Sequence, residues 1–163
     1  MKYTVITGAS SGIGRAAAES FAKRGKNLIL TARRENLLEA LRETLHQRYP
    51  APEIVVVPAD LSAPENACRF YDALREFPLE TWVNNAGFGN YASVPCQRLD
   101  KALSMLRLNV EAVTILSTLF ARDYRDAYGA QLINVSSCGG YTIVPDAVTY
   151  CASKFYVSAF TEG

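Results

Sequence analysis

Three glycines that follow directly on the first apolar run constrain this chain more than any other feature. Residues 3–7 are typical of a short strand, and the letters TGASSGIG occupy residues 7–14. A turn of this composition lets the backbone bend sharply, approach a ligand closely and open a helix packed tightly on the sheet. The spacing is G-x-x-x-G-x-G rather than G-x-G-x-x-G, so a generic glycine-rich turn is the alternative. The favoured interpretation is a helix N-terminus that can hold a phosphate group.

The rest of the chain repeats the alternation of strand and helix. After the strand at 3–7, strands are expected at 27–32, 54–57, 81–84 and 131–136, and helices at 12–24, 35–49, 64–76, 99–128 and from 147 onward. The run at 54–57 is continuously apolar, which is typical of a strand covered on both faces. Repeated βα units predict an α/β fold: a doubly wound, three-layer parallel sheet of the Rossmann type. We expect five strands in one domain, residues 1–163.

Composition and charge restrict the class of partner. The 163 residues include 17 basic and 16 acidic ones, a net charge of +1, which gives no electrostatic reason to expect nucleic acid or an anionic membrane. No signal peptide is recognisable, and the apolar stretches look too short to span a bilayer. Cys68, Cys96, Cys138 and Cys151 form no C-x-x-C pair and His46 is the single histidine, so we expect no metal site. Reduced thiols in a cytoplasmic protein are the expected state.

The end of the second expected strand bears on the choice of dinucleotide. In folds that bind NAD, an acidic residue about 20 residues past the glycines holds the ribose 2′-hydroxyl. Here that place holds Ala32, followed by Arg33 and Arg34. A guanidinium can grip a 2′-phosphate, so we expect NADP(H) rather than NAD(H), with a further hydroxyl contact from Ser10 or Ser11. The alternative is that the two arginines form a solvated helix start.

Groups suited to proton transfer stand near the end of the chain. Tyr150 and Lys154 are four residues apart and share one helix face. An ammonium one turn away favours the phenolate, which can exchange a proton with a carbonyl or alcohol oxygen. Such a pair alone is common on helix surfaces. However, Ser137 comes thirteen residues before Tyr150, at the carboxyl end of the fifth strand, where ligands of α/β sheets bind and a hydroxyl can contact a substrate carbonyl.

With these motifs in order, the chain resembles the short-chain dehydrogenase/reductase family over its whole length. The matching motifs are residues 7–14, Asn84-Asn85-Ala86-Gly87, the strand end at Ser137 with its neighbour Ser136, and Tyr150-x-x-x-Lys154. The resemblance implies that Tyr150 is the general acid/base, that Lys154 holds the nicotinamide ribose and that Ser137 is the active-site serine. It also implies that Asn109 supports a proton relay through water, whereas a polar residue on a helix surface is the alternative.

The resemblance further implies hydride transfer between NADP(H) and a carbonyl or alcohol substrate. A non-enzymatic NADP-binding module is the alternative. The expected cofactor contacts are Gly8, Ser10, Ser11, Gly12, Ile13, Gly14, Arg33, Arg34, Asp60, Leu61, Asn84, Ala86, Gly87, Tyr150 and Lys154.

Two expectations concern the ends and faces of the structure. Members of the family continue past the catalytic helix, so the chain is expected to be incomplete at its C-terminus, with the fifth strand as an exposed edge. The apolar face of helix 99–128, with Val110, Val113, Leu116 and Phe120, is expected to form a homodimer or homotetramer interface. Packing of that face inside the chain is the alternative.

Overall fold

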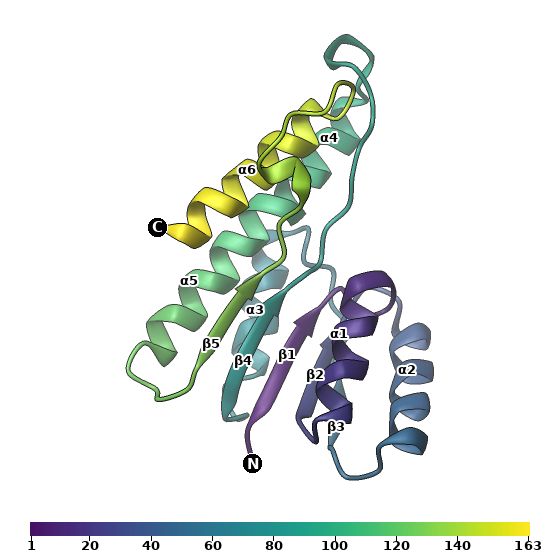
Figure 1. Ribbon diagram of the computed structural model, residues 1–163, viewed down its shortest axis with the longest axis vertical. Helices are drawn as coiled ribbons and strands as arrows, with labels where there is room; N and C mark the ends of the chain where they lie inside the picture. The colour runs from purple at the N-terminus through teal and green to yellow at the C-terminus, as the bar shows by residue number, and fades with distance from the viewer.

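A five-stranded parallel sheet forms the centre of the molecule, which a computed structural model describes from Met1 to Gly163 (Figure 1). The strands are β1 (Tyr3–Thr7), β2 (Asn27–Thr31), β3 (Ile54–Val56), β4 (Leu79–Asn84) and β5 (Gln131–Asn134). Their order across the sheet is β3-β2-β1-β4-β5, and every pairing is parallel. The winding reverses between β1 and β4, and open α/β sheets bind ligands at such a reversal, beyond the carboxyl ends of the strands.

Helices cover both faces of this sheet, which confirms the predicted doubly wound fold. They are α1 (Gly12–Lys23), α2 (Glu35–Arg48), α3 (Pro64–Ala73), α4 (Leu99–Leu106), α5 (Val113–Tyr124) and α6 (Val148–Glu162). Short 3₁₀ turns are η1 (Val94–Cys96) and η3 (Cys138–Gly140). Alternate strand residues enter opposite cores: Val5 packs with α3 and α5, whereas Ile6 packs with α1 and α2.

The two outer strands are less covered than the three inner ones. β3 is an edge strand whose residues are half-buried. Its two faces are nevertheless both covered, as predicted for 54–57, because Ile54 and Val56 pack against one core and Val55 and Val57 against the other. β5 is the other edge, as expected, and Ile133 on it is 40% exposed. The central strand β1 is buried along its whole length.

The long helix predicted at 99–128 differs in two respects. It ends at Tyr124, and between α4 and α5 it passes through a π-helical segment, η2 (Arg107–Ala112). Contrary to the expectation from the sequence, the continuous helix Leu99–Tyr124 is long and apolar enough, by length and composition, to cross a membrane. Core helices of soluble proteins meet the same criterion, and Ala112, Leu116 and Phe120 of this one pack in a core with residues of the sheet.

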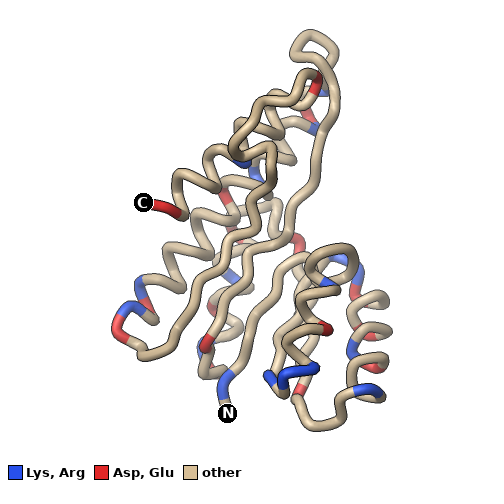
Figure 2. Tube along the Cα trace, viewed as in Figure 1, with Lys and Arg blue, Asp and Glu red and all other residues tan.

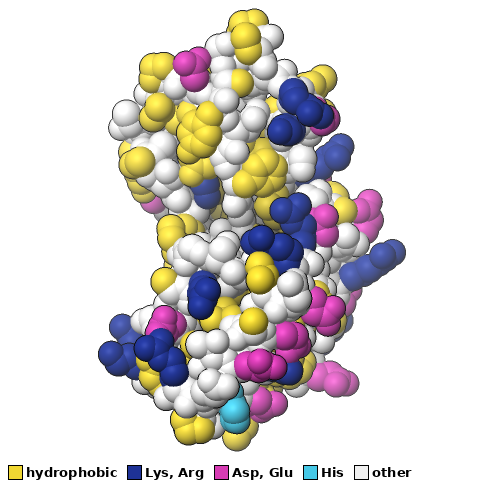
Figure 3. All heavy atoms as spheres, turned by 90° about the vertical axis from the view of Figure 1, so that its right-hand side faces the viewer, with side chains coloured by type: hydrophobic (Ala, Val, Ile, Leu, Met, Phe, Trp, Pro, Cys, Tyr) yellow, Lys and Arg dark blue, Asp and Glu magenta, His cyan; other side chains and the backbone are white.

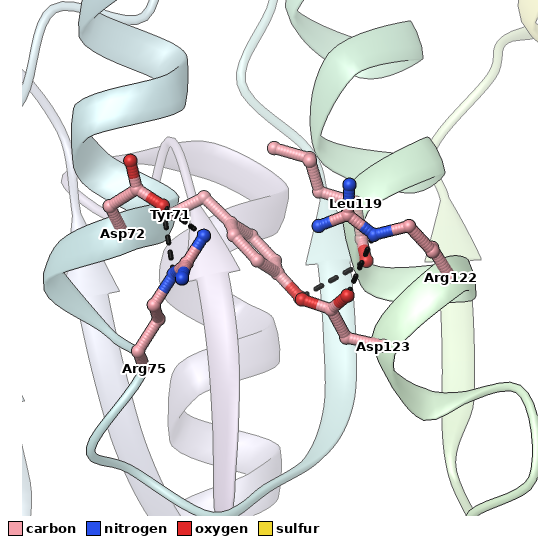
Figure 4. Close-up of polar contacts among 6 residues, drawn as sticks. All are labelled: Tyr71, Asp72, Arg75, Leu119, Arg122 and Asp123. Atoms are coloured by element: carbon pink, nitrogen blue, oxygen red, sulfur yellow. Dashed lines mark hydrogen bonds and ion pairs between the residues drawn. The ribbon is translucent and has the colours of Figure 1, made fainter.

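The apolar face of that helix packs inside the chain. Val113, Leu116 and Phe120, expected at an interface between subunits, are buried within the chain, and Val110 is half-buried. The expectation that these buried side chains face another subunit is therefore wrong, and Leu116 and Phe120 fill the core with residues of β1 and β4. Beside them, the Tyr71 hydroxyl of α3 donates to the Leu119 carbonyl at 3.1 Å and lies 3.0 Å from the Asp123 carboxylate (Figure 4).

Candidate active site

A pocket of about 500 Å³ opens along the carboxyl ends of the strands, at the reversal between β1 and β4. Its size is typical of a small-molecule site. The lining comes from the segments that follow the five strands, from the first turn of α1, from η2 and from α6. The residues are Gly8, Ser10, Ser11, Gly12, Ile13, Ala32, Arg33, Arg34, Ala59, Asp60, Leu61, Asn85, Ala86, Gly87, Phe88, Gly89, Leu108, Val135, Ser136, Tyr150 and Lys154. The glycine-rich turn, the arginines and the Tyr-x-x-x-Lys pair therefore face one cavity.

The glycine-rich turn can accept an anionic group. Ser11 is the N-cap residue of α1, and no side chain caps this helix end, so the first N–H groups remain available to a ligand. Gly12 has φ +54°, and a Cβ there would point into open space. Gly14 lies outside the lining, and a Cβ on it would come within 2.5 Å of the Asn85 amide nitrogen. The backbone of the turn can therefore surround a phosphate group. Larger side chains in place of its glycines would change the shape of the turn.

Thr7 and Asn85 tie this turn to the end of β4. The Thr7 hydroxyl accepts hydrogen bonds from the backbone N–H groups of Asn85 and Ala86, both at 2.9 Å. In return, the Asn85 side-chain amide donates to the Thr7 carbonyl at 2.9 Å and to the Gly8 carbonyl at 3.3 Å. Two sequence motifs that lie far apart in the chain consequently form one rigid wall of the pocket.

Two basic residues lie where the chain leaves β2 for α2 (Figure 2). They line the end of the pocket beside β2. Arg33 and Arg34 are exposed, and neither makes an ion pair with a carboxylate. The Arg34 guanidinium reaches the Ser10 hydroxyl at 3.5 Å. Across the pocket, hydrogen bonds from Ser62 and the charge of Arg33 hold the pKa of Asp60 below its ordinary value, although partial burial opposes this. Two unpaired guanidinium groups beside a serine fit a phosphate monoester.

Lys154 lies deep in the opposite end of the pocket. Only 6% of the residue is exposed, and its amine donates to the Val135 carbonyl at 2.8 Å. Burial lowers the pKa of this amine below its ordinary value, because a charged ammonium loses hydration there. The half-buried Tyr150 precedes it by one turn of α6 and lines the same cavity.

The two serines after β5 have different surroundings. The Ser136 hydroxyl donates to the Lys154 carbonyl at 3.0 Å and lies 2.8 Å from the Ser158 hydroxyl, so it joins the strand end to α6. The Ser137 hydroxyl accepts a hydrogen bond from the Gly139 N–H at 3.1 Å. A Cβ built on Gly139 would lie 3.6 Å from the Ser137 oxygen and 3.5 Å from Cε1 of Tyr150. Ser137 is therefore close to Tyr150, although it does not line the main cavity.

Asn109 lies in the π-helical segment and is buried. Its side-chain amide donates to the Phe88 carbonyl at 3.0 Å and to the Ser153 hydroxyl at 3.2 Å, and its oxygen accepts from the Phe88 N–H at 3.2 Å. Both amide hydrogens are thus engaged within the protein. The surface position considered as an alternative is wrong, and the side chain holds the pocket wall in place.

The structure brings most of the predicted site residues together. Four lie outside the cavity lining: Gly14, Asn84, Asn109 and Ser137. Asn84 is buried behind the wall, where its amide donates to Ser117 and Asn134 and its oxygen accepts from Trp82. Sequence reasoning missed several lining residues, namely Ala32, Ala59, Gly89, Leu108, Val135 and Ser136. For most of these the signal was available, because they directly adjoin predicted strand ends or residues already chosen.

Comparisons with known proteins agree with this geometry. Residues 2–163 match the sequence model of the short chain dehydrogenase family. Sulfoacetaldehyde reductase 2 of Chromohalobacter salexigens is 37% identical over 161 residues, which cover 96% of this chain and 63% of the relative.

Two solved structures show the same fold. A short-chain dehydrogenase from Sphingobium yanoikuyae in complex with NADPH superposes with a TM-score of 0.93 at 30% identity, covering 100% of this chain and 64% of the other. A short chain dehydrogenase/reductase from Burkholderia phymatum in complex with NAD gives a TM-score of 0.88 at 32% identity, covering 99% and 58%. This chain therefore spans less than two thirds of the length of each of these relatives. Since the family model extends over almost every residue and the neighbours share the complete topology seen here, the chain belongs to the short chain dehydrogenase family.

Proposed function

We propose that this chain forms the cofactor-binding and proton-transfer part of an NADP(H)-dependent oxidoreductase that interconverts a carbonyl compound and an alcohol. The observation that carries the proposal is the shared cavity: the glycine-rich turn and two unpaired arginines line one end, and Tyr150 and Lys154 line the other. When bound, NADP(H) would supply or accept the hydride.

The residues that would hold the cofactor follow from the cavity. The uncapped N-terminus of α1, with Ser11 and Gly12, fits the pyrophosphate, because free N–H groups there stabilise negative charge. Asp60 and Leu61 would line the adenine end, and Ala86 and Gly87 the wall between the two ends. A Cβ on Gly87 would meet the Asn109 oxygen at 2.9 Å, so this wall has no room for a larger residue.

Tyr150 would act as the general acid/base. In reduction its hydroxyl gives a proton to the forming alkoxide oxygen, and in oxidation the phenolate takes it back. The Ser137 hydroxyl, close to the Tyr150 ring, would donate a hydrogen bond to the same substrate oxygen. The Lys154 amine would stabilise the phenolate and contact the cofactor ribose, since it is the one cationic group at this end of the cavity.

The preference for the phosphorylated cofactor rests on Arg33 and Arg34. No carboxylate follows β2 at Ala32, where one would repel a 2′-phosphate and hold a 2′-hydroxyl. The solved relatives include complexes with either cofactor, so this chain's own residues carry the argument.

A fluorescence titration with NADPH and NADH, on protein whose intact mass has been measured, tests the cofactor assignment. We expect tighter binding of NADPH, and we expect Arg33→Ala and Arg34→Ala to remove most of the difference. The control is Arg24→Ala, since Arg24 is exposed and lies outside the pocket. Equal or tighter binding of NADH by the parent chain would overturn the preference, and no binding of either would overturn the cofactor site.

The Tyr150→Phe variant separates the enzyme from a non-enzymatic NADP-binding module. It keeps the ring but removes the proton, so turnover of a carbonyl substrate should fall by at least about a hundredfold while NADPH affinity changes little. A Tyr150→Phe variant as active as the parent would remove Tyr150 from this role.

A further inference from the structure

An aromatic side chain outside the cofactor cavity lies directly against Tyr150. Tyr91, on the loop between β4 and α4, has its ring centroid 6.1 Å from that of Tyr150, with the two planes at 40°. Its ring also lies over Gly89, where a Cβ would approach Cε2 of Tyr91 to 2.9 Å. Tyr91 is nevertheless 73% exposed. One part of this ring thus packs beside Tyr150, and the rest is open to a ligand.

The loop that carries Tyr91 is held at both ends. Near its start, the backbone of Phe88 forms hydrogen bonds in both directions with Asn109, and the Phe88 side chain lines the cavity. Near its end, Gln97 accepts a hydrogen bond at 2.8 Å from Thr149, the residue before Tyr150. These contacts hold the loop, and with it the aromatic ring of Tyr91, beside Tyr150.

The segments that flank Tyr150 carry almost no charge. Residues 88–97 contain no acidic or basic side chain, and residues 137–149 contain only Asp146, an exposed carboxylate. The ammonium of Lys154 is buried and donates to a backbone carbonyl, and the guanidinium groups of Arg33 and Arg34 lie at the other end of the cavity. Figure 3 shows hydrophobic side chains gathered on the upper half of this face, with basic ones at its right-hand edge and across its middle. Residues 88–97 and 137–149 thus offer no cation to an anionic substrate group, and the guanidinium of Arg98, which follows the first of these segments, pairs with the Asp100 carboxylate at 2.7 Å.

From this arrangement we infer that the site takes an uncharged carbonyl or alcohol compound bearing an aromatic or other bulky apolar group, and that Tyr91 binds that group beside the reacting oxygen. The inference rests on the proposed function, because it takes Tyr150 as the acid/base. A ring edge or face against Tyr91 gains apolar burial and aromatic contact, whereas a carboxylate or sulfonate there would lose hydration with no cation to replace it.

Ligand-observed NMR on the full chain saturated with NADPH tests this without requiring turnover. The probes are methyl 4-acetylbenzoate, its free acid 4-acetylbenzoate, and an acetophenone that carries a quaternary ammonium group. We expect the neutral ester to bind about tenfold or more tightly than the acid, and more tightly than the cation. Tyr91→Ala should weaken binding of the ester about fivefold to tenfold, and Tyr91→Phe should retain it. The control Tyr128→Ala should bind as the parent does, because Tyr128 is 98% exposed at the opposite end of β5.

The inference would be overturned by equal or tighter binding of the acid or the cation, by an unchanged affinity in Tyr91→Ala, or by no binding of the ester. Failure of the proposed function has a different signature. It would show as absent NADPH binding in the titration, or as undiminished turnover in Tyr150→Phe. A chain that binds NADPH and needs Tyr150 but prefers 4-acetylbenzoate would contradict only the substrate class.

Discussion

The side chain of Asn109 pairs with the backbone of Phe88 in the manner of a neighbouring strand. Its oxygen accepts from the Phe88 N–H at 3.2 Å, and its nitrogen donates to the Phe88 carbonyl at 3.0 Å. The same nitrogen donates to Ser153 on α6. One buried amide therefore connects the π-helical segment, the pocket wall and the helix that carries Tyr150.

Replacing that amide should be costly. Asn109→Ala leaves both backbone groups of Phe88 without their partner, so we expect the free energy of unfolding to fall by about 2–4 kcal/mol. NADPH binding should weaken as well, because Gly87 and Phe88 line the pocket. Urea denaturation and NADPH titration measure the two effects. Asn27→Ala is the control: its hydrogen bonds to Lys2 and Glu53 are exposed, and it should lose less than about 1 kcal/mol. Equal losses in the two variants would contradict the role given to Asn109.

Local patterns were sufficient to predict the elements of the fold. Tyr3–Thr7 is buried along its length and precedes a glycine-rich turn, and Leu38, Leu41 and Leu45 recur at helical spacing and are buried on α2. Such patterns depend on neighbours in the chain. The π-helical register of Arg107–Ala112 was missed, since it differs from an α-helix by one hydrogen-bond step and has no distinct composition. The edge position of β3 could not be predicted from residues 54–57, because the order of strands in a sheet depends on contacts between segments far apart in the chain.

The sequence was sufficient to predict the site residues that belong to a recognisable motif. The contacts between residues of different motifs, which determine the geometry of the site, could not be predicted. The hydrogen bonds of Asn85 to Thr7 join residues 78 positions apart, and the ring contact of Tyr91 with Tyr150 joins the β4-to-α4 loop to α6. Only the packing of the sheet brings such pairs together.

The Tyr71 hydroxyl lies outside the pocket, and its hydrogen bonds lead to a prediction about stability. It contacts Leu119 and Asp123 across the α3–α5 boundary, where Arg122 pairs with Asp123 (Figure 4). Burial and the hydrogen bond to the Asp123 carboxylate raise the pKa of Tyr71, so the hydroxyl keeps its proton near neutral pH and can donate it. Tyr71→Phe should lower the free energy of unfolding by about 1 kcal/mol and leave NADPH affinity unchanged. A fall in NADPH affinity would show that this contact is coupled to the site.

Lys154 gives a dependence of stability on pH. Burial lowers its pKa below the ordinary 10.5, so in the pH range between the folded and unfolded values the unfolded chain binds more protons at this residue. The contribution of Lys154 to stability therefore increases as the pH rises through that range. We expect the stability of the parent relative to Lys154→Met to increase as the pH rises toward the ordinary lysine pKa of 10.5. The exposed Lys101, changed to Met, is the control. A difference between parent and Lys154→Met that is constant with pH would contradict the lowered pKa.

Gly140 sets how closely the loop after β5 approaches α6, and its substitution gives the most specific prediction. A Cβ there would meet the Ser158 hydroxyl at 2.6 Å and the Lys154 carbonyl at 2.8 Å, in addition to the Ser136 hydroxyl. The carbonyl belongs to the backbone of α6 and cannot move aside alone. Gly140→Ala should therefore lower the free energy of unfolding by about 1–3 kcal/mol and separate Ser137 from Tyr150.

Turnover distinguishes this displacement from a general loss of stability. With methyl 4-acetylbenzoate and NADPH as substrates, we expect Gly140→Ala to reduce the turnover rate about a hundredfold. A displacement of about 1 Å between reacting groups has an effect of that size. NADPH affinity should fall much less than the rate, because the glycine-rich turn and Arg33 and Arg34, at the other end of the cavity, are not displaced. Ser136→Ala loses the bonds to Lys154 and Ser158 without adding volume, so it should cost only about 1 kcal/mol. The double variant should regain little of the lost rate, because the clash with the Lys154 carbonyl remains. Full activity in Gly140→Ala would mean that catalysis does not depend on this close approach.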